Sequence, residues 1–211
     1  GRLTTTTYTQ SSGGLLAATS VTSPDPDGSG PLSGFTSRTD LNPVTRTVTK
    51  TTDPNGKVTS GTYDALGRLL TVRYPDRQGA TVPSVEYAYS VNPNGLNAVV
   101  TKTVGADGTT QHAGSTLYDG LMRPFQTQKE SVYAGPSHTD DTATRGRVIA
   151  HTFYDTAGRL ANQTGEWWTK GAPGATPVVV PDVTASFTTY VYDGAGRMTD
   201  EILWNGTESN A

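Results

Sequence analysis

Three near-copies of one short motif constrain what this chain can fold into. The sequence reads YDALGR from Tyr63, YDTAGR from Tyr154 and YDGAGR from Tyr192. In each copy the Asp stands three residues before the Gly, which is the offset between the first and fourth positions of a type I turn. An Asp at the first position can accept the amide hydrogen two residues on, and a Gly can take positive φ at the bulge that lets the strand return. The motif therefore predicts a β-hairpin that the chain uses repeatedly.

Two further copies are degenerate. The run TDPNGK from Thr52 keeps the Asp-to-Gly offset, with Thr in place of Tyr and Lys in place of Arg. The run YDGLMR puts Met122 where the Gly belongs, and because a side chain at positive φ is costly, we expect that turn to differ and to use Gly120 instead. The residues assigned to structural turns are Asp53, Gly56, Tyr63, Asp64, Gly67, Arg68, Tyr118, Asp119, Arg123, Tyr154, Asp155, Gly158, Arg159, Tyr192, Asp193, Gly196 and Arg197.

The Tyr and the Arg of each copy flank the turn on its two strands. A ring face and a guanidinium placed there can stack on each other, and the guanidinium can also reach a carboxylate. Each such contact at a partly exposed site contributes about 0.5 to 1 kcal/mol. The contact is small singly but recurs with every hairpin, so these residues are expected to build structure.

The composition favours an all-β chain. Hydrophobic residues make up only 33% of the sequence, while 24 Gly and 13 Pro supply turns between strand-like runs spaced by roughly ten residues. No helical periodicity persists for ten residues. The sequence therefore predicts an antiparallel meander of repeated hairpins. The expected strands cover residues 44–51, 58–63, 69–74, 85–91, 98–104, 109–118, 125–133, 148–154, 160–167, 186–192 and 198–204.

Three segments interrupt this rhythm, at residues 23–34, 134–146 and 170–182. Their Gly, Pro, Ser and Asp content predicts long loops. The first three residues read like the second half of a repeat whose Tyr-Asp is missing. We therefore interpret the chain as a piece of a longer repeat protein.

Together with the Thr-rich spacers and the run DPNGKVT, the repeated motif resembles the Rhs, or YD-repeat, family. That family includes bacterial polymorphic toxins, the cocoon-forming component of insecticidal toxin complexes and the YD shell of teneurins. The resemblance implies that residues 1–211 are part of one β-sheet strip that spirals into a hollow shell. It also implies that the remainder of the same shell and an enclosed C-terminal cargo domain are partners, and that the protein is secreted or displayed at the cell surface. The expected function is structural, encapsulation without enzymatic activity.

No cluster of side chains in the sequence indicates catalysis, a metal or a cofactor. The run SHTDD at residues 137–141 places Ser, His and Asp side by side, whereas a catalytic triad needs groups that converge from separate elements. The pairs Asp25-Pro26 and Gly95-Leu96 are interpreted as turns, because neither continues into the self-cleaving segment that such shells often carry. The three His residues are scattered without ligand spacing, and we interpret them as solvated or core residues: His112, His138 and His151.

An adhesive or carbohydrate-binding surface is the alternative function. It depends on Trp167 and Trp168, whose rings could stack on sugars if exposed; the other interpretation is that one packs in the core and one against a loop. A net charge of -3 argues against nucleic acid as a partner. No apolar stretch approaches the roughly 18 residues needed to span a bilayer, so this segment is not expected to insert into a membrane. The two edges of an open strip are expected to pair with another chain.

Overall fold

The computed structural model describes residues 3–25, 34–93, 96–131, 146–179 and 186–205. These residues contain fifteen strands and one short 3-10 turn, η1 (Pro75–Arg77). The first strands are β1 (Thr5–Gln10), β2 (Leu16–Thr22), β3 (Thr36–Leu41), β4 (Val48–Thr52), β5 (Val58–Tyr63), β6 (Leu69–Arg73), β7 (Val85–Ser90) and β8 (Asn97–Val104). They are followed by β9 (Gln111–Tyr118), β10 (Pro124–Ser131), β11 (Gly146–Tyr154), β12 (Leu160–Thr164), β13 (Trp167–Lys170), β14 (Phe187–Tyr192) and β15 (Met198–Trp204).

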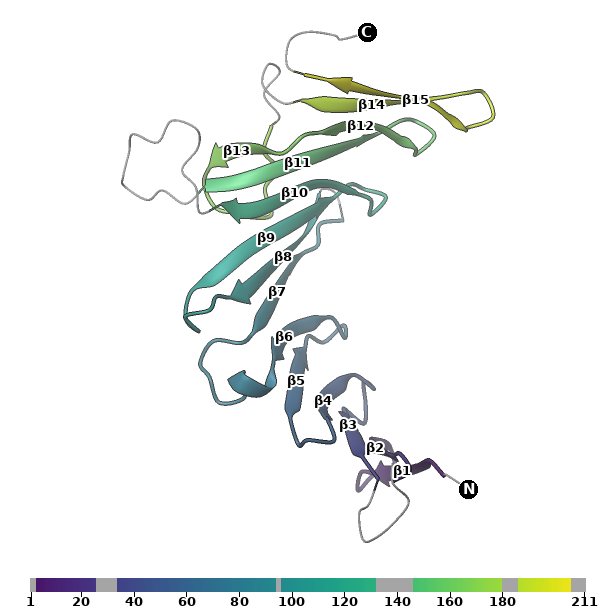
Figure 1. Ribbon diagram of the computed structural model, residues 1–211, viewed down its shortest axis with the longest axis vertical. Coiled ribbons are helices and arrows are strands. Elements are labelled where there is room, and N and C mark those ends of the chain that lie inside the picture. The colour runs from purple at the N-terminus through teal and green to yellow at the C-terminus, as the bar shows by residue number, and fades with distance from the viewer. Residues whose placement is uncertain (1–2, 26–33, 94–95, 132–145, 180–185, 206–211) are drawn as a thin grey trace. The chain divides into compact units, whose positions relative to one another are not determined.

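The strands pair in chain order. Hydrogen-bonded neighbours run from β1 to β12 and then to β14 and β15, while β13 pairs with β11 off this path (Figure 1). Each pairing with a defined register is antiparallel. The prediction of an all-β antiparallel meander is confirmed. Within the described residues no helix is long and apolar enough to cross a membrane.

Some strand boundaries differ from those expected. Strands β5 and β15 begin and end where the sequence predicts them, whereas β1, β2 and β3 were not anticipated. The strand expected from residue 44 begins only at Val48, because the Asn42 side chain accepts the backbone N–H of Val44 at 2.9 Å and holds the chain in a turn. The strand expected over residues 160–167 ends at Thr164, and Trp167 opens a separate strand that pairs with β11.

The chain folds as two compact units. Unit 1 comprises Gly1–Tyr87 with Thr103–Thr110, and unit 2 comprises Ala88–Lys102 with Gln111–Ala211. The buried apolar side chains among the described residues are few: Ala18 and Val85 in unit 1, and Ala98, Leu117 and Ile149 in unit 2. Backbone pairing and turn contacts therefore contribute a large share of the order in each unit, in place of an extensive hydrophobic core.

The three expected loops are described in part. Residues 26–33 and 132–145 lie outside the described residues and include most of the first two loops. In the third, residues 171–179 are described and form no strand or helix. Their backbone is bound by side chains of β10, and these contacts are considered below.

Candidate functional site

The motif at Asp64 shows how the sequence makes its turn. The backbone N–H of Gly67 donates to the Asp64 carbonyl at 3.0 Å, and the Asp64 N–H donates to the Arg68 carbonyl at 2.9 Å. Gly67 has a φ of 77°, and the strand register shifts by one residue beside the turn. This is a type I turn followed by a bulge residue of positive φ, the geometry of a three-residue hairpin loop. The backbone geometry of the turn therefore requires the Gly to stand three residues after the Asp.

The same two backbone bonds close the other motif turns. They occur at the turns beginning with Asp53, Asp119, Asp155 and Asp193, at 2.9 to 3.0 Å. The corresponding glycines all have positive φ: Gly56 (75°), Gly158 (81°) and Gly196 (80°). A further copy, missed in the sequence, begins at Ser11 and has Gly14 at 77°. A Ser replaces the Asp and Leu15 replaces the Arg in this copy, so the only sequence signal was the offset of three to a Gly.

The turn at Asp119 does not differ from the others, so the expectation that it uses Gly120 is wrong. Met122 itself takes the positive φ, at 60°, and its N–H donates to the Asp119 carbonyl at 3.0 Å. The Met122 side chain is 61% exposed and therefore meets little crowding. The backbone strain of a non-glycine residue there, about 1 to 2 kcal/mol, is offset by the contacts that Asp119 makes with Arg123.

In the four motifs that end in Arg, both oxygens of the Asp carboxylate are bound within the turn. In the turn at Asp119, one carboxylate oxygen accepts the backbone N–H of Leu121 and of Arg123, both at 2.9 Å. The other oxygen accepts the Arg123 Nε–H at 2.8 Å. The backbone N–H of the motif Arg, with its side chain as a further cause, holds the pKa of each such carboxyl below its usual value, at Asp64, Asp119, Asp155 and Asp193. A carboxylate bound in this way is a turn-forming group and a poor proton acceptor.

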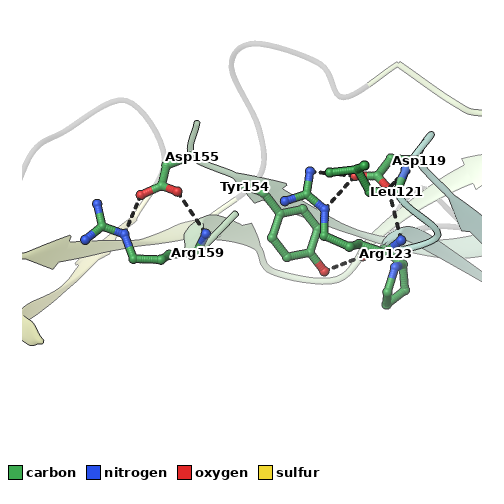
Figure 2. Close-up of polar contacts among 7 residues, drawn as sticks. Asp119, Leu121, Arg123, Tyr154, Asp155 and Arg159 are labelled. Atoms are coloured by element: carbon green, nitrogen blue, oxygen red, sulfur yellow. Dashed lines mark hydrogen bonds and ion pairs between the residues drawn. The ribbon is translucent and has the colours of Figure 1, made fainter. Parts of the chain in front are cut away.

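The Tyr and the Arg stack between neighbouring hairpins, and not within one motif as the sequence suggested. The Arg123 guanidinium lies 4.2 Å from the centre of the Tyr154 ring, which belongs to the next motif along the chain (Figure 2). The Arg159 guanidinium lies 4.5 Å from the ring of Tyr192 in the motif after that. We call the three turns at residues 119–123, 155–159 and 193–197 the turn ladder of unit 2. Arg123 and Arg159 each join one turn of this ladder to the following one.

The Tyr hydroxyls make the reverse connection. Tyr154 donates to the Pro124 carbonyl and Tyr192 to the Leu160 carbonyl, both at 2.9 Å. Each acceptor is the residue that follows the Arg of the preceding turn. In unit 1, Tyr63 also donates to a backbone carbonyl, that of Val48, at 2.8 Å. Two hairpins are therefore held together by one ring through both its face and its hydroxyl.

The motif Gly also leaves room for the preceding Arg. A Cβ added at Gly158 would lie 3.2 Å from the Arg123 Nη1, and one at Gly196 would lie 3.7 Å from the Arg159 Nη1. At Met122 the neighbour is different, because the Asn97 amide donates to its sulfur at 3.4 Å.

The chemical candidates from the sequence do not gather into a site. Among the described residues no group of three or more His, Asp or Glu could hold a metal ion. His112 and His151 lie on different strands, and His138 and the run at residues 137–141 lie outside the described residues, as do Pro26 and Gly95.

The two Trp residues are not open stacking surfaces. Both are only partly exposed, and both indole N–H groups are buried without a hydrogen-bond partner. Trp168 pairs with Val148 of β11, and its indole lies where a Cβ on Gly146 would be. The absence of a Cβ at Gly146 therefore leaves the space that the Trp168 ring occupies, which the sequence did not reveal.

Comparison with known proteins gives one family match. Residues 43–78 match the family model of the RHS repeat. No curated protein sequence matches the chain.

Solved structures also match the chain. The crystal structure of TcdB2-TccC3 aligns with a TM-score of 0.66 at 17% sequence identity, covering 94% of this chain and 11% of that one. A structure of the Photorhabdus luminescens Tc holotoxin pore aligns with a TM-score of 0.24 at 11% identity, covering 100% of this chain and 16% of that one. The chain therefore spans only a small part of the first of these structures, and at that identity the likeness shows a shared fold.

Proposed function

Because the chain belongs to the Rhs, or YD-repeat, family, we propose that it is a structural segment of a shell whose wall encloses a C-terminal cargo domain. The turn ladder of unit 2 is the observation that carries this proposal. Its Arg and Tyr contacts join each hairpin to the next, so the arrangement extends by repetition. A sheet held together in this way can form a wall without a thick hydrophobic core.

In this proposal the segment contributes containment and no catalysis. The motif carboxylates are bound by their own turns, and the described residues contain no metal-binding cluster. Its partners are the remainder of the same shell, the cargo, and a further chain that pairs with an edge strand. The similarity to a structure named for a complex, TcdB2-TccC3, supports association with other shell chains, and with it a secreted or surface location.

Protease protection of the cargo tests this function. The experiment uses the longest available form of the protein that contains this chain. Replacing both Arg123 and Arg159 by Ala removes the two Arg–Tyr contacts between successive turns of the turn ladder. We expect the enclosed domain to be digested by a protease concentration that leaves it intact in the wild type. Lys129→Ala is the control, because this exposed Lys pairs with the exposed Glu166, at 3.4 Å, and neither residue belongs to the turn ladder. Cargo that is digested equally in the wild type would refute enclosure.

The adhesive alternative has its own test. Reproducible binding of the chain to a glycan array, abolished by Trp168→Ala but retained by Lys129→Ala, would favour a carbohydrate-binding surface. Both indole N–H groups are buried, so they could not donate to a sugar hydroxyl in this arrangement, and binding would have to depend on the partly exposed ring faces alone.

A further inference from the structure

Residues 171–179, which we call the strap, lie in unit 2 beside β10 and β11. The strap forms no regular secondary structure, yet its backbone is bound by two glutamine side chains of β10. These glutamines, Gln126 and Gln128, are 1% and 0% exposed. They occupy alternate positions of the strand, so they share one face of the sheet with the buried Ile149. The strap therefore covers a polar face.

The glutamine amides bind the strap as a neighbouring strand would. The Gln126 Nε2 donates to the Val178 carbonyl at 2.7 Å, and its Oε1 accepts the Val178 N–H at 2.9 Å. The Gln128 Nε2 donates to the Thr176 carbonyl at 2.9 Å, and its Oε1 accepts the Gly174 N–H at 3.0 Å. Both donor and acceptor capacities of each amide are used by the backbone of the strap.

A chain of hydrogen bonds links these amides in one direction. The Arg147 Nη1 donates to the Gln128 Oε1 at 2.9 Å, and the Gln128 Nε2 donates to the Gln126 Oε1 at 2.9 Å. The Gln126 Nε2 then lies 3.1 Å from the His151 Nδ1. A guanidinium can only donate, so Arg147 fixes the orientation of both amides. The His151 Nδ1 must accept, which places the proton of the neutral ring on Nε2.

The surroundings of the imidazole favour this neutral form. The ring stacks on Phe153 with centres 4.7 Å apart, and burial lowers the pKa of His151 below its usual 6.5. The groups around it are Gln126 and Phe125 from β10, Thr164 from β12, Phe153 and Arg147 from β11 itself, and the Val178 carbonyl from the strap. None of these described groups is an acid, and the positive charge of Arg147 belongs to the same hydrogen-bonded network.

We propose that the strap is an acid-opened clasp, closed while the His151 Nδ1 accepts from Gln126 and released when that nitrogen is protonated. An imidazolium would direct its Nδ1–H at the Gln126 amide N–H, donor against donor. Rotating the Gln126 amide would relieve this contact, but it would then face the donors of Val178 and Gln128 with its own N–H. The clasp is a property of the fold and does not depend on the proposed enclosure.

The direction of the pH effect follows from linkage. With the strap open, the His151 pKa returns toward 6.5, whereas burial holds it lower with the strap closed. The open state therefore takes up the proton first, and closure is complete above about pH 6.5 and weakens as the pH falls through that value. Uptake of one proton can increase the equilibrium constant for opening the strap by at most about tenfold per pH unit. This increase stops when the pH reaches the His151 pKa of the closed state.

Hydrogen exchange of the Gly174 and Val178 amides measures the opening, because both N–H groups are held by the clasp. In the 211-residue chain, corrected for intrinsic exchange, we expect their protection to fall up to about tenfold per pH unit between about pH 6.5 and pH 5.5. His151→Asn should abolish this pH dependence, because the Asn Oδ1 occupies the position of Nδ1 and does not titrate. His112→Asn, which changes the half-exposed His of β9, should leave the pH dependence unchanged.

Two results would overturn the clasp. One is protection of Gly174 and Val178 that does not change over this pH range, or that changes equally in His151→Asn. The other comes from Gln126→Glu, whose carboxylate favours the imidazolium. An NMR titration should place the His151 pKa above 6.5 in that variant and below it in the wild type, and equal values would show that Gln126 does not control the ring.

Discussion

Replacing Gly158 by Ala tests whether the motif Gly makes room for the preceding Arg. At a φ of 81°, an Ala destabilises the folded chain by about 1 to 2 kcal/mol of backbone strain. The same substitution restricts the unfolded chain, which restores about 0.4 to 1 kcal/mol of stability. The net loss from the backbone is therefore about 1 kcal/mol. The new Cβ would also lie 3.2 Å from the Arg123 Nη1, and the guanidinium must move away. Weakening its stacking on Tyr154 adds up to about 0.5 to 1 kcal/mol. Gly158→Ala should therefore cost about 1.5 to 2 kcal/mol.

Gly196→Ala is the matched control. It has almost the same φ, 80°, but its Cβ would lie at an ordinary 3.7 Å from the Arg159 Nη1 and should cost only about 1 kcal/mol. Urea unfolding followed by circular dichroism gives both free energies of unfolding. In an Arg123→Ala background the difference between the two glycine variants should disappear. If Gly158→Ala costs no more than Gly196→Ala, or if the difference persists without Arg123, the proposed second role of the Gly is wrong.

Two further predictions concern the same turns. Tyr154→Phe keeps the ring beneath Arg123 but removes the 2.9 Å hydrogen bond to the Pro124 carbonyl, so the free energy of unfolding should fall by about 1 kcal/mol in urea titrations; unchanged stability would contradict this. The motif carboxyls have pKa values below the ordinary 3.8 in the folded chain, so as the pH falls the unfolded chain takes up protons first. The contribution of these carboxylates to the free energy of unfolding is therefore present above about pH 3.8 and is lost as the pH falls below it. Urea unfolding between about pH 5 and pH 2.5 should therefore show decreasing stability, and a flat profile would contradict it.

The sequence predicts the hairpins well because their signal is local. The Asp carboxylate binds amides two and four residues on, and the Gly takes positive φ within the same turn. Strand β15 follows directly from such a turn and begins where expected, at Met198. Strands β1 to β3 have no full motif beside them, and all six residues of β1 are exposed, so its Thr-rich sequence carries no alternation of burial. The fold class was therefore predictable, and these strands were not.

Contacts between hairpins could not be predicted, because they depend on how loops of different length bring the turns together. Tyr154 lies in the motif after Arg123, and the separation includes residues 132–145. The strap was expected to be an ordinary loop, since its Gly and Pro content indicates nothing about its partners. A signal was present in β10, where Gln126 and Gln128 occupy alternate positions of one face and are both buried. Polar residues at such positions require partners, and the strap supplies them.

The position of the motif Gly follows from two separate requirements, and the exception at Met122 distinguishes them. Backbone strain alone favours Gly at every position of positive φ in these turns. A non-glycine residue can still be tolerated there where other contacts hold the turn in place. Space is needed only where the preceding turn presents an Arg, as it does to Gly158. At Gly67 the nearest atom to an added Cβ is the Thr47 Cγ2, at an ordinary 3.8 Å, so that site should accept Ala at the cost of strain alone. The structural repeat is thus a pair of hairpins. The Arg of the first turn determines which residue can occupy the positive-φ position of the second.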